Sequence, residues 1–137
     1  MAENIHLEVV TPEKIVVSEE AQIVASPGSL GDFGVLNGHT PFLTTLKTGI
    51  IRYTDANGKE RFVFVSGGFA EALPDKVTVL AESAERRSDI DLERAKEALA
   101  RAEKRLAEDR AKEETDFARA RGSLERATVR IRLVGLS

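Results

Sequence analysis

The sequence predicts a two-part fold: an all-β sandwich over residues 1–84, followed by an antiparallel α-helical hairpin over residues 85–137. Three observations carry this prediction. Short valine- and isoleucine-rich runs alternate with polar residues in the first part. The four prolines, and every glycine except Gly122 and Gly135, also lie there. The second part is instead rich in alanine, arginine and glutamate, with apolar residues at helical spacing.

Six runs in the first part have the character of strands. Ile5, Leu7 and Val9 alternate with polar neighbours, which is typical of a strand with one buried face. Asn57-Gly58 separates two later runs, and this dipeptide adopts positive φ at little cost, so it predicts a hairpin turn. Many short strands at this spacing favour a small sandwich or a flattened barrel. The remaining runs cover residues 14–18, 21–25, 50–54, 61–65 and 76–80.

Two helices are expected in the second part. Apolar residues recur at helical spacing over residues 90–106 and again, after a polar interval, over residues 117–131. Ser88, three residues before Asp91, predicts a capping box at the first helix start. The apolar stripe is mostly alanine, which buries little area. The hairpin is therefore expected to rest on the sandwich, to rest on a partner, or to alternate between the two.

The composition excludes several function classes. The chain has 137 residues and no cysteine, which rules out disulfides, cysteine nucleophiles and cysteine-ligated metals. A net charge of −3 and an aromatic content of 5%, without tryptophan, argue against nucleic-acid binding. No apolar run has the length of a membrane span, and the N-terminus lacks the apolar core of a signal peptide. We expect a cytosolic chain that reaches a membrane only through a partner.

No catalytic or metal-binding constellation is evident. The chain has no phosphate-binding P-loop and no dinucleotide fingerprint, and Ser66 lacks the preceding glycine of a nucleophile elbow. Its two histidines, His6 and His39, lie in a strand pattern and in a glycine-rich loop, without a spacing that would join them at a metal. We predict that the protein is not an enzyme.

Arginines in the predicted helices form the one remaining pattern. Arg119, Arg126 and Arg130 share a face of the second helix, and Arg94 lies near the start of the first. Guanidinium groups that converge in this way suit phosphate oxygens. A solvated helix face with ion pairs at i,i+4 spacing explains the same residues, so spacing alone leaves both interpretations open. Asp91, similarly, is either a helix cap or a ligand.

Long motifs along the whole chain resemble the ε subunit of the bacterial F-type ATP synthase, a component of its central stalk. The most distinctive is GDFGVLNGHTPFLTTLKTGIIRY at residues 31–53, which is similar to the family's FGVLPGHTPLLTxLxxG signature. Asn37 stands where the family usually has proline, and asparagine also tolerates turn geometry. Further matches are LEVVTPEKIVVS at 7–18, VSGGFAE at 65–71 and KVTVLAESAE at 76–85.

The resemblance implies a ten-stranded sandwich that couples rotation, a regulatory helical hairpin and no catalytic site. The sandwich would clamp the γ subunit to the c-ring during proton-driven ATP synthesis. The protein would lie peripherally at the cytoplasmic face of the bacterial inner membrane, as part of the synthase. The glycine-rich stretch also holds more apolar residues than a free loop favours. The residues expected to face the c-ring and γ are Ser29, Leu30, Gly31, Asp32, Gly38, His39, Thr40, Pro41 and Phe42.

The resemblance also implies that no cofactor is required and that ATP has a regulatory role. Family members that bind ATP carry the motif [Ile/Leu]-Asp-x-x-Arg-Ala, which IDLERAK at residues 90–96 matches. Gly122 interrupts the second helix and is expected to loosen the hairpin at its phosphate face. The candidate ATP-binding residues are Glu85, Ile90, Asp91, Arg94, Ala95, Arg119, Arg126 and Arg130.

Loss of ATP would let the helices extend toward the α and β subunits and hinder ATP hydrolysis. The basic residues expected to meet them are Arg101, Lys104, Arg105 and Arg110.

The alternative to an ATP synthase subunit is a free-standing β-sandwich binding module with a helical dimerisation tail. It predicts a stable homodimer without affinity for γ.

Overall fold

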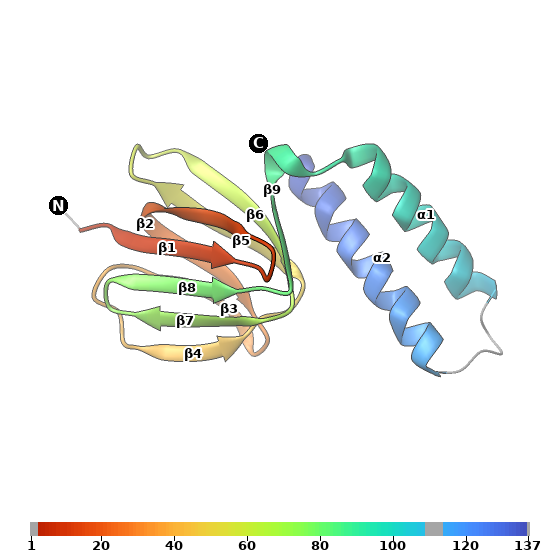
Figure 1. The fold of residues 1–137 in the computed structure, drawn as a ribbon, viewed down its shortest axis with the longest axis horizontal. Helices are drawn as coiled ribbons and strands as arrows, with labels where there is room; N and C mark the ends of the chain where they lie inside the picture. Colours follow the sequence, from red (N-terminus) through yellow and green to blue (C-terminus); the bar gives the residue numbers. More distant parts are fainter. Residues whose placement is uncertain (1–2, 109–113, 137) are drawn as a thin grey trace. The chain divides into compact units, whose positions relative to one another are not determined.

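The computed structural model describes residues 3–108 and 114–136 and confirms the predicted two-part fold (Figure 1). The chain separates into two compact units, the first ending at Arg87 and the second beginning at Ser88. The change in composition predicts a boundary near Ala84–Ser88, and this division falls within that range. The last strand of the sandwich continues to Arg86.

The first unit is a β-sandwich with nine strands among the described residues. Its strands form one folded sheet in the order β4-β7-β8-β1-β2-β5-β6-β9, and β3 pairs with β2 (Figure 1). The strands are β1 (Ile5–Val10), β2 (Ile15–Gly28), β3 (Gly31–Val35), β4 (Phe42–Thr45), β5 (Gly49–Asp55), β6 (Glu60–Ser66), β7 (Phe69–Leu73), β8 (Lys76–Leu80) and β9 (Ser83–Arg86).

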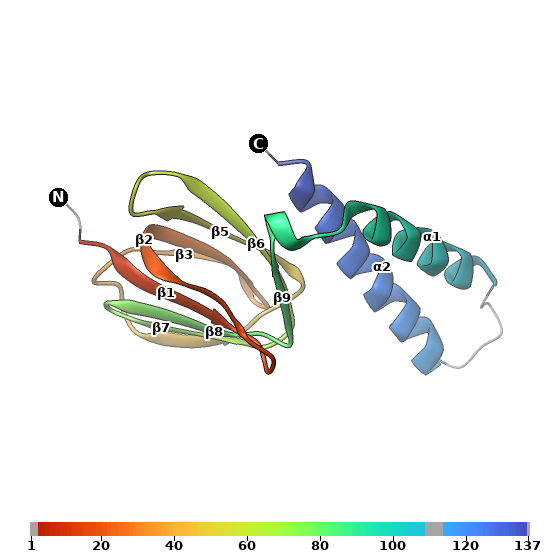
Figure 2. The ribbon, with the colours of Figure 1, turned by 45° about the horizontal axis from the view of Figure 1, so that its top comes forward.

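The long strand β2 joins the two layers of the sandwich. Its first half pairs with β1, and its second half pairs with β5 and β3. The register shifts between Ala21 and Ile23, where the strand leaves β1 for β5 (Figure 2). Two runs that the sequence indicates separately, 14–18 and 21–25, are therefore parts of one strand, because no turn residue stands between them.

The N-terminal strand β1 lies in the interior of the sheet. It pairs antiparallel with its neighbour in sequence, β2, and parallel with β8, whose residues lie about seventy positions later, such as Leu7 opposite Val77. Every other strand pair in the unit is antiparallel. The β1–β8 pair thus connects the N-terminal hairpin to the β4-β7-β8 side of the sheet.

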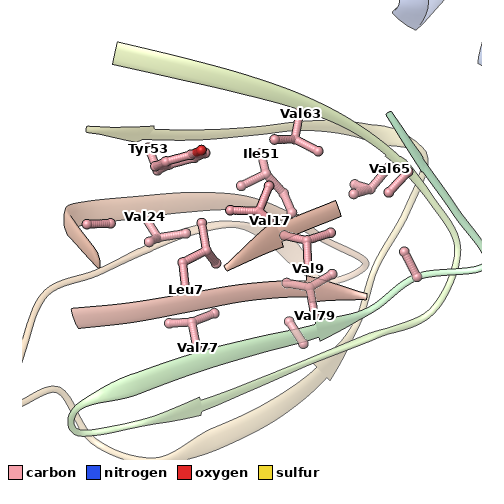
Figure 3. Packing of buried hydrophobic residues seen from close by; sticks show 14 of the residues in the cluster. Leu7, Val9, Val17, Val24, Ile51, Tyr53, Val63, Val65, Val77 and Val79 are labelled. Carbon is pink, nitrogen blue, oxygen red and sulfur yellow. The ribbon is translucent and has the colours of Figure 1, made fainter. Parts of the chain in front are cut away.

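The core between the layers is built mostly from β-branched side chains of alternating strand positions. Leu7, Val24, Ile51 and Val77 are fully buried and point toward one another in Figure 3. Within β1, Ile5, Leu7 and Val9 are buried at the period of two that a half-buried strand requires. On β7 and β8 the alternate residues face outward and carry the apolar sheet face described below, whereas β6 is buried at every position from Phe62 to Ser66.

The predicted turn at Asn57-Gly58 is confirmed. Gly58 has a φ of 84°, and β5 and β6 pair antiparallel on either side of it. The Asp55 carboxylate accepts hydrogen bonds from the backbone N–H of Lys59 (2.9 Å) and of Asn57 (2.9 Å). The Lys59 N–H above all, with the Arg61 guanidinium and the Asn57 N–H, lowers the pKa of Asp55.

A buried polar cluster fixes β9 to the sandwich. The Tyr53 hydroxyl donates to Glu19 Oε1 at 2.5 Å. Arg86 Nε donates to the Val16 carbonyl at 2.9 Å, and Arg86 Nη1 lies 3.5 Å from the Tyr53 hydroxyl. Burial, together with the hydrogen bond to Glu19, raises the pKa of Tyr53 from 10.0 to about 12.

The raised pKa of Tyr53 predicts a loss of stability in strong alkali. A group with a raised folded-state pKa stabilises the fold below its unfolded pKa and loses that contribution as the pH rises toward the folded value. We therefore expect the free energy of unfolding to fall by about 2–3 kcal/mol between pH 10 and 12 from this residue. Urea unfolding of the wild type and of Tyr53→Phe, which lacks the ionisable hydroxyl, measures this difference.

Ultraviolet absorbance tests the same shift in the pKa of Tyr53 directly. Tyr53 is the only tyrosine and tryptophan is absent, so absorbance at 295 nm follows this one phenol. A titration midpoint near 12 is expected in the folded chain. A midpoint near 10, in a chain that stays folded, would contradict the buried hydrogen bond.

The second unit consists of a short 3₁₀ helix (Arg87–Asp89) and the two helices α1 (Leu92–Glu108) and α2 (Glu114–Val134). The helices pack as the predicted antiparallel hairpin (Figure 1). Small side chains from both helices are buried, namely Ala95, Ala102, Ala120 and Ala127. Such small residues let the two backbones approach closely, although each buries little apolar area.

The start of α1 differs from the predicted capping box at Ser88. Asp91 is the N-cap, because its Oδ1 accepts the Arg94 N–H at 3.1 Å and its carbonyl accepts the Ala95 N–H at 3.0 Å. Ser88 lies in the preceding 3₁₀ turn. The helix starts later because Asp91 stands directly before it, where a carboxylate reaches the free N–H groups.

Candidate functional site

The tip loop, Ser29–Asp32, presents a fully exposed leucine on a fixed support. Leu30 is 99% exposed. The backbone N–H of the first loop residue donates to the Thr45 carbonyl at 2.9 Å. At the other end of the loop, the Asp32 carboxylate lies 3.4 Å from Lys47 Nζ. Leu30 is thus the most exposed apolar side chain of a tip that the pairing of β2 with β3 holds in place, which makes it a candidate contact residue.

The second predicted interface segment, Gly38–Phe42, lies at the opposite end of β4 from the tip loop. The Gly38 N–H donates to the Pro74 carbonyl, and His39 Nδ1–H donates to the Thr40 carbonyl at 2.8 Å. Thr40 and Pro41 are exposed. The two segments are connected through the Phe42 ring, which contacts Phe33, the residue that follows Asp32.

Phe42 and His39 belong to a small group of aromatic rings at the start of β4. The Phe42 ring contacts Phe33 edge-to-face at 4.9 Å between centroids and His39 at 5.7 Å. Asn37, at the position where the resembled family usually has proline, donates its side-chain amide to the Asn4 carbonyl at 3.1 Å. The substitution thus ties this loop to the start of β1.

Three exposed apolar side chains, which sequence reasoning missed, form a docking patch on the outer face of β4-β7-β8: Leu43, Phe69 and Leu80. They are 67%, 52% and 55% exposed. With Glu71 and Thr78 they line an open groove of about 330 Å³. The alternation of buried and exposed residues along β7 could have indicated which residues face outward, but not that this outward face is apolar.

The docking patch adjoins the tip loop. Thr45, which accepts the hydrogen bond from the tip loop, pairs in register with Phe69, and Phe69 pairs with Leu80. At the other end of the same face Lys76 lies beside Glu8 (3.5 Å) and His6 beside Glu20 (2.9 Å), and Leu73 is 38% exposed. Most of the exposed apolar side chains of the outer face therefore lie toward the tip loop, and its ion pairs lie away from it.

The structure places the candidate arginines of α2 on one helix face, as their spacing predicts. Arg119 is exposed, whereas Arg126 and Arg130 are half-buried. Arg126 Nη2 donates to Ser123 Oγ at 3.3 Å. The helix continues without interruption through Gly122, although a helical glycine costs about 1 kcal/mol relative to alanine.

The remaining candidate ATP-binding residues lie at the start of α1 and on β9. Asp91 caps α1, Arg94 is exposed and Ala95 is buried against the hairpin. Ile90 is half-buried just before the helix. Glu85 belongs to the first unit, where it pairs in register with Phe64 of β6.

Within residues 3–108 and 114–136, no three His, Asp or Glu side chains gather where they could hold a metal ion. Nor is any helix of this described part both long and apolar enough to cross a membrane. The candidate surfaces are thus a loop, an apolar sheet face and a cationic helix face.

Comparison with known proteins connects these surfaces to one family. Residues 4–87 match the model of the ATP synthase Delta/Epsilon chain beta-sandwich domain, and residues 88–135 match that of its long alpha-helix domain. The chain belongs to the ATP synthase epsilon chain family. An epsilon chain is a non-catalytic subunit of ATP synthase, which agrees with the prediction that the protein is not an enzyme.

Two bacterial epsilon chains illustrate the relationship. The ATP synthase epsilon chain of Desulforapulum autotrophicum is 63% identical over 134 residues, covering 98% of this chain and 98% of the relative. That of Nitratidesulfovibrio vulgaris is 55% identical over 135 residues, with 98% of both chains covered. The resemblance to the bacterial epsilon subunit is confirmed, and it decides against a free-standing binding module.

Two solved structures share the epsilon fold. A chain of the Euglena gracilis mitochondrial ATP synthase, solved as OSCP/F1/c-ring in rotational state 1, superposes with a TM-score of 0.77 at 24% identity, covering 91% of this chain and 78% of that one. A chain of the Tetrahymena thermophila mitochondrial ATP synthase central stalk and c-ring gives 0.60 at 8% identity, covering 97% and 98%. As an ATP synthase subunit, this epsilon chain is a peripheral component of a membrane-associated complex.

Proposed function

We propose that the sandwich of this epsilon chain clamps the γ subunit to the c-ring, at the cytoplasmic face of the bacterial inner membrane. The observation that carries this proposal is the adjacency of the tip loop and the docking patch. A subunit that clamps two partners together needs two contact surfaces that face different ways on one rigid domain. The loop end with Leu30 and the outer sheet face with Phe69 meet this requirement, since Thr45 links them through backbone pairing.

We assign the two surfaces by their shapes. The tip loop is small and protruding, with Asp32 beside Leu30, which suits the polar loops between the helices of a c-ring. The docking patch is broad, apolar and grooved, which suits the side chains of a helical partner such as γ. Co-elution of the purified chain with γ in gel filtration tests the clamp, and a failure to form that complex would overturn it.

We propose further that the hairpin is an ATP-regulated latch. The arginine face of α2 supports this, because Arg119, Arg126 and Arg130 present guanidinium groups along one side of one helix. ATP would stabilise the compact hairpin, and its release would let the helices reach the α and β subunits and hinder hydrolysis. Arg101, Lys104 and Arg105 are exposed on α1 for that contact, whereas Arg110 lies outside the described residues.

Truncation of Arg126 tests the latch. We expect Arg126→Ala to weaken ATP binding to the purified full chain at least tenfold, because a hydrogen-bonded charge contact to phosphate contributes about 1.5–3 kcal/mol. Isothermal titration calorimetry measures the affinity. Thr128→Ala, on the opposite side of α2, is the matched control and should bind as the wild type does. Equal binding by both variants would remove Arg126 from the site.

A further inference from the structure

Gly122 has an unexpected neighbour in the structure. A Cβ atom added at Gly122 would lie 3.2 Å from Nη1 of Arg126 and 4.0 Å from its Cζ. The guanidinium of Arg126 therefore lies over the glycine, in the space that any other side chain at this position would begin to fill. The sequence predicts that Gly122 loosens the helix, whereas in the structure α2 continues and the glycine makes room for an arginine.

Ser123 holds the guanidinium in this place. Its Oγ accepts a hydrogen bond from Arg126 Nη2 at 3.3 Å. Because a hydroxyl can accept and donate at once, Ser123 can still donate its own hydrogen to an anion. Side chains on a helix point toward its N-terminus, so Arg126 extends back along α2 from its own turn.

Arg119 and Arg126 lie seven residues, about two turns, apart on the same face of α2. The Arg126 guanidinium lies over Gly122, which is one turn from Arg119 along the backbone. Two such groups and a serine hydroxyl form a donor set for neighbouring phosphate oxygens.

We propose that Gly122 and Ser123 are positioning residues of the nucleotide site, which hold Arg126 so that it meets the same oligophosphate as Arg119. The inference rests on the proposed binding of ATP by the hairpin. It assigns to Gly122 a role in affinity that runs against its effect on helix stability.

Gly122→Ala separates the two effects. Alanine is the stronger helix former, so the helical signal at 222 nm should melt at a higher temperature. Its Cβ would lie 3.2 Å from Arg126 Nη1 and shift the guanidinium by a few tenths of an ångström, so ATP should bind about threefold more weakly in calorimetry. Thr128→Ala raises helix propensity on the opposite side of α2 and should leave the affinity unchanged. A purely structural role for Gly122 predicts equal or tighter binding in Gly122→Ala.

A double-mutant cycle shows whether the glycine acts through the arginine. Adding Gly122→Ala to Arg126→Ala should weaken ATP binding no further, because the positioned group is already absent. Ser123→Ala should weaken binding about threefold in the wild type and not at all in Arg126→Ala. Equal affinity of the wild type and Gly122→Ala would overturn this inference alone. Absence of ATP binding by the wild type would overturn the latch and the inference together.

Discussion

Replacing Gly68 by alanine is expected to lower the free energy of unfolding of the sandwich by about 3–5 kcal/mol. Gly68 has a φ of 102°, which side chains rarely adopt, and an added Cβ would lie 2.0 Å from the Leu80 carbonyl oxygen and 2.8 Å from the Ala81 Cα. Both neighbours are backbone atoms, so a rotamer change cannot relieve the contact. The end of β8 would have to separate from β7, at the edge of the docking patch.

Gly58→Ala is the matched control for this experiment. Gly58 also has a positive φ, 84°, but nothing lies within 4 Å of an added Cβ. The free energy of unfolding of this variant should fall by only about 1 kcal/mol, which is the cost of a positive φ for alanine. Urea unfolding followed by circular dichroism compares the two. A similar loss in both variants would show that the close approach at Gly68 relaxes readily.

The double variant Phe69→Thr and Leu80→Thr is expected to weaken binding to γ about 100-fold or more. Burial of each side chain in a complex contributes roughly 1.5–3 kcal/mol, and every 1.4 kcal/mol is tenfold in affinity. Both residues are more than half exposed in the free chain, and threonine favours strands, so the sandwich should keep its stability. Surface plasmon resonance with immobilised γ, beside thermal unfolding, measures the two quantities separately.

Ile23→Thr provides the control for the docking patch. Ile23 lies on β2, is 40% exposed and pairs with β5, away from β4-β7-β8. The Ile23→Thr variant also replaces an exposed apolar side chain by threonine, but on another face, and should leave the affinity for γ unaltered. If Ile23→Thr weakened the complex and the double variant did not, γ would bind the opposite layer.

Local patterns in the sequence predict much of the sandwich and fail where a strand depends on its partner. Alternation predicts β1 and β8, and Asn57-Gly58 predicts the turn between β5 and β6. The strand β3 was not indicated, because two glycines in Gly31–Val35 are typical of loops. It forms because β2 continues to Gly28 and pairs with it in a tight hairpin, so the strand depends on its partner rather than on its own propensity.

The candidate site was likewise predicted only in part from the sequence. The i,i+4 rule places Arg126 and Arg130 on one face, and the structure agrees. The rule does not predict where the tip of a long side chain lies. The sequence therefore indicates only that Gly122 destabilises the helix, and the structure adds that the Arg126 guanidinium lies over it. The docking patch was missed for a related reason, since alternation identifies an outward face but not its chemistry.

The parallel pairing of β1 with β8 imposes an order on synthesis of the chain. Because a ribosome makes the N-terminus first, β1 can pair with β2 early. Its pairing with β8 is possible only after Leu80, the last residue of β8, has been synthesised. During this interval one edge of β1 stays open, and an unpaired strand edge is where chains join wrongly. The β1–β8 side of the sandwich therefore cannot close before β8 has been synthesised, whereas the β1–β2 and β5–β6 hairpins are complete earlier in the chain.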